Sequence, residues 1–187
     1  MKLKEILNNT PKLNHPSTGT DKNSTHNYIE GFYEANFASY QNVNSLSLLE
    51  IGVNNGGSLY LWNKYFVNGN ILGIDIIDNL KEDWKELNNT KYIITDAYNS
   101  SFVEILPQFD IIIDDGPHSL ESQIFFLENY LDKVKPNGLL IIEDIQNISD
   151  TKILYEKTPS NFQSNISIID LRASKNRYDD ILFVIKK

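Results

Sequence analysis

The chain contains no cysteine among its 187 residues, which excludes disulfide bonds, thiolate metal sites and cysteine nucleophiles. It also lacks any run of about 20 apolar residues, so no segment is expected to span a membrane. Residues 1–13 show neither a long apolar run nor a small-residue cleavage site. We therefore expect a cytoplasmic protein without a secretion signal.

Positive charge is scarce, because 17 Lys and Arg residues stand against 25 Asp and Glu residues, giving a net charge of −8. Binding to nucleic-acid phosphates needs clustered Lys and Arg, so we expect no nucleic-acid partner. The contents of 41% hydrophobic and 22% charged residues are those of an ordinary globular protein, and the length fits one domain. The sequence leaves open whether the chain forms a homo-oligomer.

Short runs of Ile, Leu and Val alternate with helical patterns along most of the chain. Such alternation predicts an α/β fold with a mostly parallel sheet that is covered by helices on both faces. Helices are expected at 21–40, 58–67, 80–87, 102–106, 120–134 and 151–156, and parallel strands at 46–51, 71–76, 92–95, 110–113 and 139–142. The last two strands, 166–171 and 181–186, lie too close together for a helical crossover and are expected to form an antiparallel hairpin. Residues 1–40 are predicted to be a lead-in with a cover helix, and 41–187 the ligand-binding domain.

A glycine-rich turn follows the first expected strand, with the sequence Glu50-Ile51-Gly52-Val53-Asn54-Asn55-Gly56-Gly57-Ser58. Ligands of open α/β sheets bind beyond the carboxyl ends of the strands, next to such a turn. A dinucleotide fingerprint would need a glycine where Asn54 stands, so that pattern is broken. The turn fits instead the E-x-G-x-x-x-G form used for S-adenosylmethionine. We expect four residues of it to bind this cofactor: Glu50, Gly52, Asn54 and Ser58.

Acidic residues also end the next strands. Asp75 ends the second strand, where a carboxylate can accept hydrogen bonds from both ribose hydroxyls. NAD enzymes share this feature, so Asp75 indicates a nucleoside without choosing the cofactor. Asp96 and Ala97 follow the third strand, where the adenine is expected, and Asp114 is expected to complete the cofactor site. The order of these features along one chain favours S-adenosylmethionine.

Two acidic pairs, Asp114-Asp115 and Glu143-Asp144, end the fourth and fifth strands. Neighbouring strands lie ~4.8 Å apart, so these carboxylates are expected to converge and, with no Lys or Arg nearby in sequence, to repel one another. A divalent cation would resolve this repulsion, and ligands that are all oxygen favour Mg²⁺ or Mn²⁺ over zinc. The alternative is that the acids cap the next helix or bind the cofactor.

His118 is the histidine expected at this edge of the sheet, three residues after Asp115. An imidazole is a suitable base for a hydroxyl whose acidity a metal has increased. Asp115 and His118 are therefore predicted to be catalytic. The alternative is a solvated loop histidine.

The stretch 19–146 resembles the metal-dependent sugar O-methyltransferases of the mycinamicin and macrocin type and their cephalosporin-hydroxylase-like relatives. The residues that carry the resemblance include Gly19-Thr20-Asp21-Lys22, His26-x-Tyr28, Leu49-Glu50-Ile51-Gly52, Gly73-Ile74-Asp75, Asp114-Asp115-Gly116-x-His118 and Ile142-Glu143-Asp144. The resemblance implies a Rossmann-like class I methyltransferase fold with a seven-stranded sheet. It also implies that Asp115, Glu143 and Asp144 hold Mg²⁺ and that His118 is the general base.

The function expected from these features is an S-adenosylmethionine-dependent, metal-assisted O-methyltransferase. Its expected acceptor is a sugar hydroxyl in a glycan, glycolipid or nucleotide-sugar pathway, with a small phenol or catechol as the alternative. Two other classes are retained, a catalytically silent cofactor-binding module and an NAD-dependent oxidoreductase or epimerase. Asn54 disfavours the last of these, as do acids where a Tyr-x-x-x-Lys pair would be expected.

Overall fold

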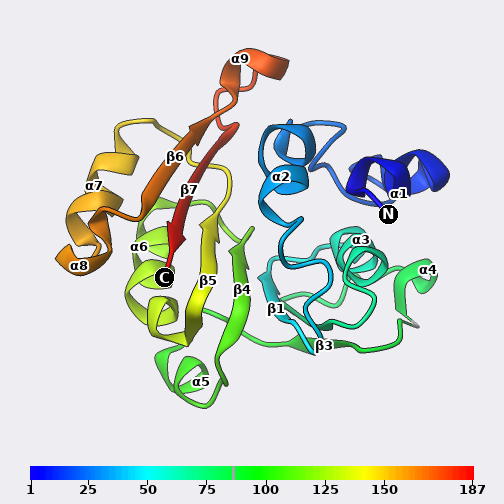
Figure 1. Cartoon of the computed structure of the whole chain (residues 1–187), viewed down its shortest axis with the longest axis horizontal. Coiled ribbons are helices and arrows are strands. Elements are labelled where there is room, and N and C mark those ends of the chain that lie inside the picture. Colours follow the sequence, from blue (N-terminus) through cyan, green and yellow to red (C-terminus); the bar gives the residue numbers. More distant parts are fainter. Residues whose placement is uncertain (86) are drawn as a thin grey trace.

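The structure is a computed structural model that describes residues 1–85 and 87–187. Within these residues one seven-stranded sheet has the strand order β3-β2-β1-β4-β5-β7-β6 (Figure 1). Only β7 runs antiparallel to its neighbours β5 and β6, and the other pairs are parallel. The strands are β1 (Ser47–Ile51), β2 (Asn70–Asp75), β3 (Thr90–Ile94), β4 (Phe109–Asp114), β5 (Val134–Ile142), β6 (Ile166–Asp170) and β7 (Ile181–Lys186).

Helices cover both faces of the sheet and enclose two apolar cores. Successive residues of β1 point to opposite faces, so Leu48 lies in one core and Leu49 in the other. One face carries α1 (Leu3–Asn9), η1 (Pro11–Leu13), η2 (Ile29–Tyr33), α2 (Glu34–Asn36), α3 (Gly57–Tyr65) and α4 (Glu82–Lys85). The other carries α5 (Ser100–Glu104), α6 (Leu120–Tyr130), η3 (Leu131–Lys133), α7 (Asp150–Lys157) and α8 (Ser160–Gln163). The predicted fold class is confirmed.

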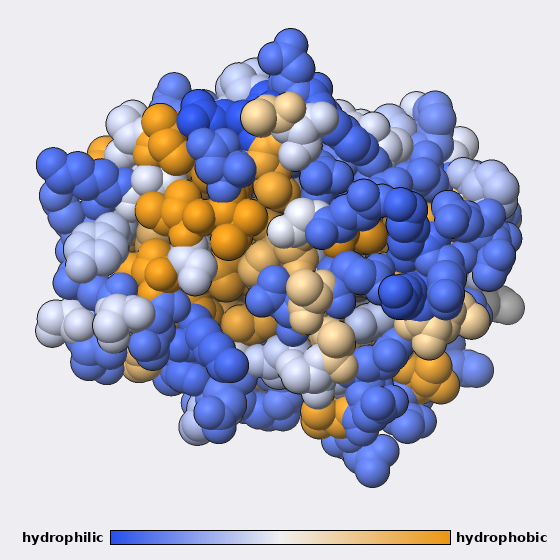
Figure 2. Space-filling view, turned by 45° about the horizontal axis from the view of Figure 1, so that its top comes forward, coloured by the Kyte–Doolittle hydropathy of each residue, from blue (hydrophilic) through white to orange (hydrophobic). Residues whose placement is uncertain are grey.

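The order of strands explains where the site must lie. β1 and β4 lie side by side at the centre of the sheet, and the chain leaves β1 towards β2 on one side and β4 towards β5 on the other. The carboxyl ends of β1 to β5 therefore open on one edge of the sheet, at the switch point of the strand order. Figure 2 shows one face of the molecule, mostly polar, with an apolar patch in the region where Figure 1 places β5, β7 and β6.

Two expected helices differ from the structure. The helix expected at 120–134 ends earlier, at Tyr130, and β5 already begins at Val134. Pro136 therefore lies inside a strand rather than after a helix. The pairing of β4 with β5 shifts its register between Phe109 and Ile111, and such a bulge accommodates a residue that has no N–H to donate.

The helix expected at 21–40 is also wrong in extent. Residues 21–26 form a turn in which the amides of Thr25 and His26 donate to the carbonyl of Asp21, and the helical part runs from Ile29 to Asn36. The turn directs the side chain of Lys22 inward, as described below. The helix expected at 80–87 corresponds to α4, and residue 86 lies outside the described residues.

The lead-in shares the core of the sheet. Leu3, Phe32 and Phe37 are buried in the same apolar core as Trp62 of α3. The expected C-terminal hairpin is confirmed, with a short helix, α9 (Arg172–Lys175), in its connection. None of the helices in the described residues is long and apolar enough to cross a membrane.

Candidate active site

The glycine-rich turn after β1 is held in place by two neighbouring strands. Gly52 has φ +79°, and a Cβ atom there would lie 2.0 Å from the carbonyl oxygen of Asp115. Only glycine therefore fits between β1 and the loop after β4. Asp75 Oδ2, at the end of β2, accepts hydrogen bonds from the backbone amides of Val53 (3.0 Å) and Asn54 (2.8 Å). The turn is thus fixed before any ligand arrives.

A cavity of about 540 Å³ opens beyond this turn. Most of the residues predicted from the sequence line it, namely Gly52, Asn54, Ser58, Asp75, Asp96, Ala97, Asp115, His118 and Asp144. Glu50, Asp114 and Glu143 do not line it, and each of them is buried. The structure therefore separates the predicted residues into a lining group and three acids behind it.

Asp114, one of these three acids, has its own partners. Its Oδ1 accepts a hydrogen bond from the hydroxyl of Tyr98, which also lines the cavity, and one of 3.3 Å from the amide of Gly116. Burial raises the pKa of Asp114 to about 7, although the Tyr98 hydroxyl opposes the shift. Asp114 thus lies behind the cavity and holds Tyr98 and Gly116, which line it. The sequence did not indicate this role.

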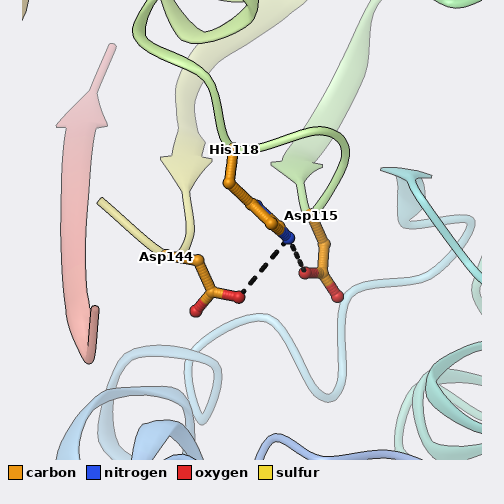
Figure 3. Close-up of side chains that lie close together, drawn as sticks. All are labelled: Asp115, His118 and Asp144. Carbon is orange, nitrogen blue, oxygen red and sulfur yellow. Dashed lines mark ion pairs between the residues drawn. The ribbon is translucent and has the colours of Figure 1, made fainter. Parts of the chain in front are cut away.

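Asp115, His118 and Asp144, which all line the cavity, form a compact group (Figure 3). The Nε2 atom of His118 lies 3.5 Å from Asp144 Oδ2 and 3.9 Å from Asp115 Oδ1. One ligand atom from each residue lies within 4.8 Å of the others, a grouping that can hold a metal ion. His118 (φ 59°) and Asp144 (φ 55°) both adopt left-handed backbone conformations, which Asp and His tolerate better than most residues other than glycine.

Lys22 is the cation inside the acidic cluster, where the sequence suggested none. Its Nζ lies 2.5 Å from Glu143 Oε2, 2.8 Å from Asp115 Oδ2 and 3.3 Å from Glu50 Oε1, and the side chain is 1% exposed. Burial by itself lowers the pKa of Lys22, but the three carboxylates together raise it well above its ordinary value. The expectation that the converging acids lack a basic partner is therefore wrong.

Both carboxylate oxygens of Glu143 already have partners. One of its carboxylate oxygens binds Lys22, and the other accepts a hydrogen bond from the hydroxyl of Tyr33. Burial raises the pKa of Glu143 well above its ordinary value, and the nearby negative charges add to this, while Lys22 opposes it. The described residues that group as metal ligands are Asp115, His118 and Asp144, without Glu143.

Two tyrosines of the lead-in bind the two acids that follow β5, and the sequence did not indicate these contacts. The hydroxyl of Tyr28 donates to Asp144 Oδ1 at 2.5 Å, and that of Tyr33 donates to Glu143. The ring of His26 stacks on Tyr28, with centroids 4.8 Å apart, and its Nδ1 lies 3.4 Å from Asp144 Oδ1. The helix expected at 21–40 did not show which hydroxyls would meet carboxylates.

The buried acids make stability depend on pH. Burial raises the pKa of Asp144 to about 6, as it raises that of Asp114 to about 7. A carboxyl with a raised pKa holds its proton more tightly in the folded state than in the unfolded state. Its contribution to stability is complete below the unfolded pKa of about 4 and is lost as the pH rises through the folded pKa.

We therefore expect the free energy of unfolding of the metal-free protein to fall between about pH 4 and pH 7, by ~1.4 kcal/mol per pH unit for each extra bound proton. Urea unfolding at several pH values with a chelator present measures this slope. The Asp114→Asn and Asp144→Asn variants should each flatten it. A free energy that is level or rises over this range would contradict the expectation.

The sheet has a single reversed strand next to its edge, and the cavity lies at the carboxyl ends of β1, β2 and β4. Together these features define a Rossmann-like class I methyltransferase fold. A family model described as "Methyltransferase domain" matches residues 49–145, and the chain belongs to this family. The match covers the strand-end residues from Glu50 to Asp144.

The curated relatives include sugar O-methyltransferases. The chain is 29% identical over 136 residues to 8-demethyl-8-alpha-L-rhamnosyl tetracenomycin-C 2'-O-methyltransferase of Streptomyces olivaceus, which covers 68% of this chain and 35% of the relative. It is 32% identical over 124 residues to mycinamicin VI 2''-O-methyltransferase of Micromonospora griseorubida, covering 60% and 30%. The resemblance stated from the sequence is confirmed. The chain spans about a third of the length of these relatives.

Among solved structures, the chain is similar to the methyltransferase MycE from the mycinamycin biosynthetic pathway, determined in complex with Mg, SAH and mycinamycin VI. The TM-score is 0.73 at 23% sequence identity, and the match covers 100% of this chain and 53% of MycE. This similarity supports the fold.

Proposed function

We propose that the chain is an S-adenosylmethionine-dependent O-methyltransferase that methylates a sugar hydroxyl with the help of a divalent metal ion. The observation that carries the proposal is a single cavity that is lined both by the glycine-rich turn and by Asp115, His118 and Asp144. In this cavity the methyl donor would lie close to a base for the acceptor hydroxyl. The sugar O-methyltransferases among the relatives support this choice of acceptor.

In this proposal the cofactor lies in the cavity, where it supplies a methyl group on a positively charged sulfur. Gly52 lets the backbone approach it closely, and Asp75 accepts hydrogen bonds from the ribose hydroxyls while it holds the turn. Asp96 and Ala97 flank the adenine position, and Asn54 and Ser58 line the wall nearest the turn. Glu50 and Asp114 support the site from behind, since neither lines the cavity.

The residues present fit a hard divalent cation. Asp115 and Asp144 lie at the cavity and offer carboxylate oxygens, and Mg²⁺ is commonly bound by one or two carboxylates together with waters. Such an ion would lower the pKa of an acceptor hydroxyl. The proposed ligands are Asp115 and Asp144, with Glu143 as a third that would first have to release Lys22. His118 is proposed to take the proton of the acceptor hydroxyl.

The lead-in is proposed to cover the site. A Cβ atom on Gly57, at the start of α3, would lie 2.1 Å from the backbone carbon of Gly19, so the two segments touch backbone to backbone. Pro16, Thr20 and Asp21 line the cavity. A segment in this position excludes water from the reacting atoms.

Calorimetry with S-adenosylhomocysteine and with NAD⁺ tests the proposed function. We expect micromolar binding of the former, and Asp75→Ala should weaken it by ~1.5–3 kcal/mol because a charged acceptor of hydrogen bonds is lost. Asp78→Ala, a nearby acid outside the cavity, is the matched control. Binding of NAD⁺ with none of S-adenosylhomocysteine would contradict the proposal.

Metal dependence is a separate expectation. Methyl transfer should fall at least about tenfold in EDTA and recover with Mg²⁺, because the ion increases the acidity of the acceptor hydroxyl. Asp144→Asn should weaken Mg²⁺ binding, and Glu143→Gln should weaken it less, since Lys22 and Tyr33 hold Glu143 in this structure. Equal activity in a chelated, metal-free preparation would show that the acids serve another purpose.

A further inference from the structure

Asp115 faces two different groups with its two carboxylate oxygens. Its Oδ2 lies 2.8 Å from the ammonium nitrogen of Lys22, and its Oδ1 lies 3.9 Å from Nε2 of His118. His118, Asp115 and Asp144 are the residues that group as metal ligands (Figure 3). The ammonium group of Lys22 and a bound metal ion would therefore share one carboxylate.

The same ammonium group also occupies Glu143. Its nitrogen lies 2.5 Å from Glu143 Oε2, and both side chains are 1% exposed. Glu143 directly precedes Asp144, so a second acid beside the proposed metal site is already bound to a cation. Two cations repel each other, so a metal ion gains the use of this oxygen only when Lys22 withdraws from it.

One ammonium group does not balance the acids that it contacts. Its nitrogen lies within 3.3 Å of Glu50, Asp115 and Glu143, so three carboxylates share a single formal positive charge. Buried carboxylates that lack a counter-ion repel one another. The cluster therefore attracts a further cation, although Lys22 holds part of its oxygens.

Glu50 gives Lys22 a partner away from the metal site. It is 0% exposed and does not line the cavity, and its Oε1 lies 3.3 Å from the ammonium nitrogen. When a metal ion takes Asp115 and Glu143, the ammonium group can keep Glu50. The exchange then leaves no buried charge without a partner, which would otherwise destabilise the protein strongly.

We infer that Lys22 is an internal competitor of the divalent metal ion, which occupies Asp115 and Glu143 in the metal-free protein, yields them when the ion binds, and so sets the metal affinity. The inference rests on the proposed function and concerns the regulation of its metal site. Lys22 acts through the acids and is a positioning residue.

Calorimetric titration of the metal-free protein with MgCl₂ tests this competition. We expect Lys22→Met to bind Mg²⁺ at least about tenfold more tightly than the unsubstituted chain, because a positive charge beside the ion is removed and Glu143 becomes available. A lysine that only supported the fold would have the opposite effect, since its loss would loosen the acids and weaken Mg²⁺ binding. The sign of the change thus separates the two roles.

Lys81→Met is the matched control. The ammonium group of Lys81 donates to the carbonyl of Ser17, so it also fastens the lead-in to the rest of the chain, but through a backbone oxygen instead of an acid. If Lys22 acted only by holding the lead-in in place, the two substitutions would change the Mg²⁺ affinity alike. We expect Lys81→Met to leave it unchanged.

A double-mutant cycle with Glu143→Gln identifies the carboxylate that is released. In the unsubstituted chain, Glu143→Gln should change the Kd for Mg²⁺ less than about threefold, because it removes a ligand and a hold on Lys22 together. In Lys22→Met, the same substitution should weaken Mg²⁺ binding at least about tenfold and so cancel most of the gain.

Folding provides a second readout if Lys22→Met does not fold without metal. Mg²⁺ should then refold it, as followed by circular dichroism, because the ion replaces the missing ammonium group among the acids. NaCl at the same ionic strength should not refold it. An unfolded variant that Mg²⁺ does not rescue would overturn the inference.

A Kd for Mg²⁺ that is equal or higher in Lys22→Met than in the unsubstituted chain would also overturn the inference and leave the proposed function standing. The same holds if Glu143→Gln has equal effects in both backgrounds, or if Lys81→Met tightens Mg²⁺ binding as Lys22→Met does. If neither the unsubstituted chain nor any variant binds Mg²⁺, the metal ion of the proposed function is itself overturned, together with the inference.

Discussion

Replacing Lys22 by methionine is expected to lower the free energy of unfolding by about 3–5 kcal/mol, because the substitution leaves buried carboxylates without their counter-ion. Glu50 and Glu143 are 0% and 1% exposed, so water cannot take over the role of the ammonium group. Methionine retains most of the length and the apolar stem of lysine, so the loss should reflect the missing charge rather than a cavity. Urea unfolding at pH 7 measures it.

Lys152→Met is the matched control for this substitution. Lys152 also pairs with a carboxylate, that of Glu156 at 3.8 Å, but its side chain is 80% exposed, and such a pair contributes ~0.5 kcal/mol or less. Adding Glu143→Gln to Lys22→Met should recover part of the loss, because it removes one of the unpaired charges.

Hydrogen exchange locates the effect. Lys22 joins the lead-in to three acids at the carboxyl ends of β1, β4 and β5. Hydrogen exchange in residues 15–30 should therefore become faster in Lys22→Met and stay unchanged in Lys152→Met. A stability loss below about 1 kcal/mol, equal to that of the control, would show that the ion pairs contribute little.

The strand ends were predictable because of a general property of parallel sheets. Runs of Ile, Leu and Val located each strand, and parallel strands end at the same edge, so Asp75, Asp115 and Asp144 had to meet there. The limits of helices were less predictable. Pro136 indicated a helix stop, but a bulge between β4 and β5 accommodates it inside a strand.

The sequence did not show which residues of the lead-in and of the segment before β7 would contact the acids at the strand ends. Lys22 contacts Glu143 across 121 positions, and Tyr28 contacts Asp144 across 116. Such contacts depend on the path of the lead-in through the turn before η2. The spacing of hydrophobic residues in the sequence does not specify this path. Asp179 lines a hollow together with His118 and Asp144 only because β7 is antiparallel to β5. Two acids directly before an apolar strand, Asp179 and Asp180, were the available signal.

His118 presents the sharpest test of the proposed chemistry. Methyl transfer is a displacement at carbon, and a sugar hydroxyl is too weak an acid to ionise unaided near neutral pH. A base must take its proton as the new bond forms. The imidazole lines the cavity and is 29% exposed, so a substrate can reach it. Its Nε2 also lies 3.5 Å from Asp144, which makes a role as metal ligand the competing interpretation.

His118→Asn separates these two roles. Asparagine tolerates the left-handed backbone at this position (φ 59°), so the loop should keep its shape while the base is lost. We expect kcat to fall by roughly 10²–10⁴, the usual contribution of a general base, with S-adenosylhomocysteine and Mg²⁺ affinities nearly unchanged. His15→Asn, in the exposed part of the lead-in, is the matched control and should retain full activity. A parallel loss of Mg²⁺ affinity would identify His118 as a metal ligand instead. If His118→Asn keeps most of its activity, the carboxylates and their metal ion must activate the hydroxyl without a histidine base.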